Sequence, residues 1–142
     1  MIVYCDTSAL MKLFVKEQHS AFVQRESKAA QRLFVSMLTW TEMLAALGLK
    51  QRTAQVDVAQ MALALQQLEA QWPRYHQLAI DAALASEAGQ LALRFGLRAY
   101  DSVQLASAHR AHQQLGANLA FCCFDKQLNI AANGLGIHVL TV

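Results

Sequence analysis

The stretch "IVYCDTSALMKLF", residues 2–14, places an acid between a short apolar run and a helix-favouring segment. The run "IVY" at 2–4 is bounded by polar sequence and predicts a buried strand. Asp6 follows it, and "ALMKLF" then predicts a helix. Asp6 is therefore either a helix cap or one wall of a reactive site. Because Ser8 is a competing cap residue, we expect Ser8 to cap this helix and Asp6 to face outward from the strand end.

Three further apolar runs predict buried strands at 33–37 ("LFVSM"), 119–123 ("LAFCC") and 137–142 ("IHVLTV"), the last at an edge of the sheet. "YHQLAI" at 75–80 could add a short strand or an extended connection before Asp81 caps the next helix. Between these runs lie stripes of helical period, formed by Val58, Met61, Leu65 and Leu68 and by Leu84, Ala88, Leu91 and Phe95. Trp72 and Pro73 interrupt the helical middle. Strands separated by helices predict an α/β fold with a mainly parallel sheet covered on both sides.

The length of 142 residues fits one domain, so we expect residues 1–142 to form a single domain. Apolar residues make up 55% and charged residues 15% of the chain, against about 45–50% and 25% in ordinary soluble domains. A partner or a second copy of the chain would cover part of that apolar surface. The net charge of +2 excludes a dedicated DNA-coating protein.

Cys5, Cys122 and Cys123 give neither an even disulfide framework nor zinc-type spacing, which predicts buried free thiols in a reducing compartment. No signal-peptide pattern begins the chain, and no apolar run approaches the 18 residues of a membrane span. We therefore expect a soluble cytoplasmic protein with no membrane contact. His109 and His112 lack an HExxH pattern and are expected at the surface.

Four acids stand at strand–helix junctions: Asp6, Glu42, Asp101 and Asp125. Asp6 and Asp125 follow predicted strands, Glu42 lies five residues beyond one, and Asp101 opens the helix "DSVQLASAHRAHQQL". In an open parallel sheet, ligands bind outside the carboxyl ends of the strands. The four carboxylates are therefore expected along one edge of the sheet.

Helix capping explains each acid taken singly, because carboxylates at helix starts bind free amides and offset the dipole. Thr39-Trp40-Thr41-Glu42 even matches a capping box, in which Glu42 would bond to the Thr39 amide. Capping does not require a common edge, however, whereas a metal site requires several hard oxygen ligands that converge. Converging carboxylates would repel one another and bind protons unless a divalent cation neutralised them. Mg²⁺ or Mn²⁺ fits such an all-oxygen site.

The four segments "YCDTSALMKLF", "LTWTEMLAAL", "AYDSVQLASA" and "CCFDKQLNIAA" resemble, in this order, the motifs of the PIN-domain ribonucleases. The resemblance covers the whole chain and is strongest to the VapC-type toxins of bacterial and archaeal toxin–antitoxin pairs. It implies a three-layer α/β/α fold with a five-stranded parallel sheet, RNA cleavage that depends on a divalent metal, a homodimer and a small cognate antitoxin.

Carried over residue by residue, the resemblance makes Asp6, Glu42, Asp101 and Asp125 the metal-binding and catalytic set, with Ser8 as an accessory polar group. The family often has Thr or Ser where this chain has Cys123, which affects a hydrogen bond behind the metal ligands. Lys12 and Lys126 are candidates for contact with the RNA backbone. The expected reaction is hydrolysis by a water that one or two Mg²⁺ or Mn²⁺ ions activate.

Two other classes of protein share parts of this pattern. Phosphoryl-transfer enzymes also place an Asp after the first strand, but the haloacid-dehalogenase type would have a second Asp where Ser8 stands, and receiver domains would have an acidic pair before the first helix. A non-catalytic RNA-binding module on the same fold would have lost some of the acids, and none is missing. A PIN nuclease that processes RNA outside a toxin pair remains compatible with the same residues.

Overall fold

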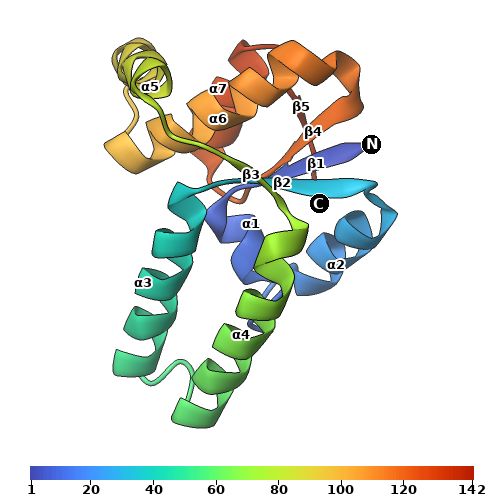
Figure 1. The fold of residues 1–142 in the computed structure, drawn as a ribbon, viewed down its shortest axis with the longest axis vertical. Helices are drawn as coiled ribbons and strands as arrows, with labels where there is room; N and C mark the ends of the chain where they lie inside the picture. Colours follow the sequence, from blue (N-terminus) through green and yellow to red (C-terminus); the bar gives the residue numbers. More distant parts are fainter.

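Five short strands form one parallel sheet in the computed structural model, which describes residues 1–142 (Figure 1). They are β1 (Ile2–Cys5), β2 (Arg32–Ser36), β3 (His76–Leu78), β4 (Leu119–Cys122) and β5 (His138–Val139). The strand order is β3-β2-β1-β4-β5, and every neighbouring pair is parallel. The predicted parallel sheet is confirmed, including the edge position of the last strand, and of the two alternatives for 75–80 the structure has the short strand, at 76–78.

Seven α-helices and two 3₁₀ turns connect the strands. They are α1 (Thr7–Met11), α2 (Ser20–Ala29), α3 (Leu38–Arg52), α4 (Val58–Gln71), η1 (Trp72–Arg74), α5 (Ala82–Phe95), α6 (Ala99–Leu115), η2 (Gly116–Asn118) and α7 (Lys126–Gly134). The break at Trp72 and Pro73 is present as η1, and Asp81 caps α5 by accepting the Leu84 amide at 2.8 Å.

The helices cover both faces of the sheet because successive residues of each strand point to opposite sides. Val3 and Cys5 of β1 pack into the core beneath α1–α4, whereas Tyr4 packs into the core beneath α5–α7. Figure 1 shows α3 and α4 below the sheet and α6 and α7 above it. The three-layer α/β/α fold expected from the sequence is therefore confirmed.

Two details of the predicted elements are wrong. The last strand spans only 138–139 rather than 137–142, because it pairs with β4 at Ala120 and Phe121 alone. The predicted stripe on α4 includes Val58, which is 70% exposed, while Leu68 is buried and Met61 and Leu65 pack at the edge of the core. In the stripe on α5, Leu84, Ala88 and Leu91 are buried as predicted, and Phe95 packs partly buried against the same core.

β1 and β4 lie side by side at the centre of the sheet, where the order of strands reverses. In open α/β sheets the crevice outside the carboxyl ends at such a reversal is the usual ligand site. Asp6 directly follows β1, and Asp125 follows β4 after two residues. The fold thus brings these two acids to the point where ligands are expected.

The three cysteines are free and buried, as predicted. None of the helices combines the length and apolar character that crossing a membrane would require.

Candidate active site

Asp6 is the N-cap of α1 and lies almost completely buried at the carboxyl end of β1, with 6% of its surface exposed. Its Oδ1 accepts the Ala9 amide at 3.0 Å and the Ser8 hydroxyl at 2.7 Å, and its Oδ2 accepts the Cys123 thiol at 3.0 Å. The expectation that Ser8 caps this helix is wrong. Because α1 begins at Thr7, Ser8 lies inside the helix, and its hydroxyl instead accepts the Phe124 amide at 3.0 Å.

Burial raises the pKa of Asp6 to about 6, although hydrogen bonds from Cys123, Ala9 and Ser8 lower it, and the charge of Glu42 raises it further. The Cys123 thiol supplies the hydrogen bond that Thr or Ser would give at its position. Burial raises the pKa of the Cys123 thiol far above its usual range, and the charge of Asp6 adds to this effect. The thiol therefore keeps its proton. Cys123 therefore acts as a neutral donor to Asp6 and also accepts the Asp125 amide at 3.3 Å.

Glu42 lies on α3 and its Oε1 accepts the Thr7 hydroxyl at 2.8 Å and the Gln104 side-chain amide at 2.7 Å. The predicted capping box from Thr39 to Glu42 is wrong. α3 begins at Leu38, one residue before Thr39, and no side chain caps it. The carboxylate of Glu42 is therefore turned toward α1 and α6, while its Oε2 has no hydrogen-bond partner in the protein.

Gln104 on α6 is a residue that the sequence analysis missed. It is 2% exposed, and its Oε1 accepts the Tyr4 hydroxyl at 2.7 Å. Its Nε2 donates to Glu42 and to the Thr39 hydroxyl at 2.9 Å, with a longer contact to Thr7 at 3.3 Å. The available signal was its spacing, because Gln104 follows Asp101 by three residues and so shares its helix face.

Asp101 and Asp125 are partly buried and lie close enough for their charges to interact. Partial burial and then the charge of Asp125 raise the pKa of Asp101, while Arg98 lowers it from 3.8 Å away. Asp101 lies in the first turn of α6, which begins two residues earlier than predicted, at Ala99. Asp125 caps α7, as its position suggested, because its Oδ1 accepts the Leu128 amide at 2.9 Å.

The four acids are linked at one edge of the sheet as two neighbouring pairs, Asp6 with Glu42 and Asp101 with Asp125, joined by Cys123. No three His, Cys, Asp or Glu side chains lie close enough together to form a ready metal cluster. The donors nevertheless fit Mg²⁺, because this ion keeps several waters and is commonly held through one or two carboxylates. The raised pKa values of Asp6 and Asp101 reflect burial and like charge that a cation would offset.

The two lysines proposed to contact RNA differ in their surroundings. Lys12 forms one ion pair, with Glu17 at 2.9 Å, and its ammonium lies 4.7 Å from the Phe124 ring centre; 12% of its side chain is exposed. Lys126, the first residue of α7, is exposed and has no ion-pair partner. Of the two, Lys126 is the cation that is free to meet a ligand.

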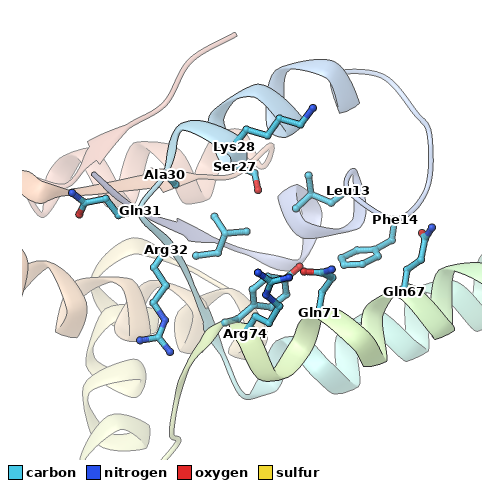
Figure 2. Close-up of a pocket in the computed structure, with 12 residues that line it drawn as sticks. Leu13, Phe14, Ser27, Lys28, Ala30, Gln31, Arg32, Gln67, Gln71 and Arg74 are labelled. Atoms are coloured by element: carbon cyan, nitrogen blue, oxygen red, sulfur yellow. The ribbon is translucent and has the colours of Figure 1, made fainter.

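Two cavities differ in their relation to the acids. A cavity of about 300 Å³ borders Glu42 and is lined by Leu38, Thr41, Glu42, Ala45 and Tyr100. The largest cavity, of about 660 Å³, contains none of the four acids and lies near Arg32, where β2 begins (Figure 2). Figure 2 shows Lys28 and Arg32 pointing away from each other there, so these cations do not converge on one point.

Comparison with known proteins adds to this geometry. The model of a family described as the PIN domain matches residues 3–132. Ribonuclease VapC46 of Mycobacterium tuberculosis is 32% identical over 138 residues, which cover 97% of this chain and 95% of that protein. FitAcB from Neisseria gonorrhoeae has a TM-score of 0.71 at 18% identity, over 99% of this chain and 97% of the other. A toxin–antitoxin complex from Klebsiella pneumoniae has a TM-score of 0.66 at 18% identity, over 98% and 96%.

Proposed function

Because this chain belongs to the PIN domain family, together with the VapC ribonucleases, we propose that it hydrolyses RNA phosphodiester bonds with the help of Mg²⁺ or Mn²⁺. The observation that carries the proposal is the edge of the sheet at which Asp6, Glu42, Asp101 and Asp125 lie beside the reversal of strand order. All four positions are acidic, and only Asp101 has an ion pair, with the exposed Arg98 at 3.8 Å.

Asp101 and Asp125 are the residues that would hold a cation, with Asp6 behind them. Neither Asp101 nor the Oδ2 of Asp125 accepts a hydrogen bond from the protein, so these oxygens are available. The bound ion would supply charge stabilisation and a more acidic water. Asp6 accepts three hydrogen bonds, which fix its carboxylate and reduce the freedom of the site before any ligand binds.

Glu42 is the residue that would orient the attacking water. Gln104 and Thr7 both donate to its Oε1, so the side chain is held in one position and Oε2 remains free to accept a hydrogen bond or a proton. Groups in this role typically contribute 10²–10⁴-fold to a rate. Ser8, which bridges Asp6 and the Phe124 amide, has a supporting role, and Lys126 would contact the RNA backbone.

Cleavage of a mixture of single-stranded and structured RNAs tests the proposal. We expect RNA cleavage with Mg²⁺ or Mn²⁺ and none with a chelator. Asp101→Asn and Asp125→Asn should each reduce the cleavage rate by at least about 100-fold, which exceeds the loss typical of substitutions at residues that only support metal ligands. Glu69→Gln is the matched control, because Glu69 is exposed on α4 and has no ion pair. Cleavage that persists in chelator, or full activity in both Asp101→Asn and Asp125→Asn, would contradict the proposal.

A small antitoxin is the proposed protein partner, and a homodimer is the proposed assembly. Support for the antitoxin comes from the similar fold found in a toxin–antitoxin complex and from the VapC relatives. Exposed apolar side chains such as Met37, Leu49 and Leu93 are consistent with surfaces that a partner covers. The free thiols are consistent with a cytoplasmic location. Copurification of the chain with a small protein encoded beside its gene would support the antitoxin, and light scattering of the purified chain tests the homodimer.

A further inference from the structure

The cavity of about 300 Å³ beside Glu42 has walls that suit a flat apolar ligand. Leu38, Thr41 and Ala45 of α3 form one side, and Tyr100 in the first turn of α6 forms the other. Glu42 lines the same cavity, and Tyr100 directly precedes Asp101. The cavity is therefore continuous with the proposed active site.

Tyr100 is the most exposed tyrosine of the chain. It is 64% exposed, whereas Tyr4 and Tyr75 are buried at 0% and 9%. Tyr100 neither stacks on another aromatic ring nor forms a side-chain hydrogen bond. An unpartnered aromatic face at the mouth of an active site is available to stack on a ligand.

The charges around the cavity indicate which part of an RNA it would accept. Its lining contains the carboxylate of Glu42 and no lysine or arginine, and Asp101 lies next to Tyr100. Such surroundings repel a phosphate or an acidic peptide. A nucleobase is uncharged, has apolar faces and carries polar groups on its edge, which the exposed Thr41 hydroxyl could meet.

We propose that this cavity binds one unstacked RNA base, next to the bond that is cleaved, with the base stacked on Tyr100. The inference rests on the proposed function and adds the contact that positions the strand. RNA-binding proteins commonly use aromatic side chains in this way on single-stranded segments. Tyr100 is then a substrate-binding residue that favours unpaired RNA at this position.

Abasic substitution provides the test. A short RNA that contains one mapped cleavage site is prepared with a single abasic nucleotide at each position in turn, and kcat/KM is measured for wild type, Tyr100→Ala and Tyr100→Phe. Stacking of a base on an aromatic side chain converts to roughly 5- to 150-fold in affinity. We expect wild type to lose that factor at one abasic position, Tyr100→Ala to lose it on the intact RNA, and the two losses not to multiply. Tyr100→Phe keeps the ring and should keep the wild-type rate.

Leu63→Ala is the control, because Leu63 on α4 is 54% exposed and lies outside the cavity, and its activity should equal that of wild type. The inference is wrong, while the proposed function stands, if Tyr100→Ala cleaves RNA like wild type. The same conclusion holds if the loss of kcat/KM caused by Tyr100→Ala multiplies with the loss caused by an abasic nucleotide at every position. If Tyr100→Ala instead changes only the molar mass in light scattering, a second copy covers this face and the inference is also wrong. If wild type neither cleaves nor binds any RNA, both are overturned.

Discussion

Replacing Asp6 by Asn should stabilise the metal-free protein at neutral pH, even though it should abolish activity. Asp6 is 6% exposed, and its burial raises its pKa from 3.8 to about 6. Asn caps helices about as well as Asp, so the bond from the Ala9 amide can be kept. The substitution therefore removes a buried charge and leaves the cap in place.

The size of the effect follows from the pKa shift. Since the folded pKa lies about two units above the unfolded value, ionised Asp6 lowers the free energy of unfolding by about 3 kcal/mol at pH 7. Between about pH 4 and pH 6 the folded protein retains a proton that the unfolded chain has released, so stability from this group falls as pH rises through that interval. Below about pH 3 both states are protonated, and the advantage of Asn should vanish.

Urea unfolding of wild type and Asp6→Asn in chelator, at several pH values from about 3 to about 8, measures the difference directly. We expect the variant to be more stable by about 1–3 kcal/mol at about pH 7.5 and equal to wild type near pH 3. Adding Mn²⁺ should raise the stability of wild type and reduce the gap, because a cation stabilises the ionised carboxylate. A variant that is less stable than wild type at pH 7.5 in chelator, or a gap that does not depend on pH, would refute the reasoning.

Three further predictions concern the residues around the acids. Gln104→Leu should lower the free energy of unfolding by about 1–3 kcal/mol, measured by urea unfolding, because it leaves the buried polar partners of Gln104 unsatisfied. It should also reduce the rate of single-turnover RNA cleavage more than about tenfold, measured by a cleavage time course. Cys123→Ser should retain cleavage within a few-fold, since a hydroxyl can also donate to Asp6, whereas Cys123→Ala should move the acidic limb of the pH–rate profile to higher pH. For Glu17, partial burial raises the pKa, but Lys12 and a second lysine outweigh it and lower the pKa. The contribution of this pairing is present above the unfolded pKa and is lost as pH falls through the folded one, so Glu17→Gln should be less stable by up to about 1 kcal/mol at pH 7 and equal to wild type near pH 3 by urea unfolding.

The strands and the edge that carries the acids could be predicted because their signals are local. A short apolar run followed by an acid and a helical segment marks a strand–helix junction, and parallel strands bring such junctions to one edge. Asp6 and Asp125 could therefore be placed from the sequence. Their number and order also sufficed to indicate the family that the comparison confirmed.

The capping assignments at Ser8 and Thr39 failed because the identity of a cap depends on the residue at which the helix begins, which sequence patterns do not locate to one or two positions. Ser8 and Asp6 both have side chains that cap helices, and only the start of α1 at Thr7 decides between them. The same applies to Thr39, since a capping box there requires the helix to begin at Trp40, and α3 begins two residues earlier, at Leu38. Gln104 was missed for a different reason, because glutamine in a helix is usually exposed and its partners Tyr4, Thr39 and Glu42 are distant in sequence.

Capping and catalysis are compatible roles for these acids, although the sequence presents them as alternatives. The cap bonds of Asp6 and Asp125 each use Oδ1, and for Asp125 this leaves Oδ2 without a protein partner. Each cap also places a carboxylate against the positive end of a helix, which offsets part of the repulsion among neighbouring acids. Cys123, which donates to Asp6 and accepts from the Asp125 amide, then fixes the spacing between the two caps. The helices thus hold the carboxylates at the sheet edge before a ligand arrives, and a substitution that keeps the cap but removes the charge separates the two roles.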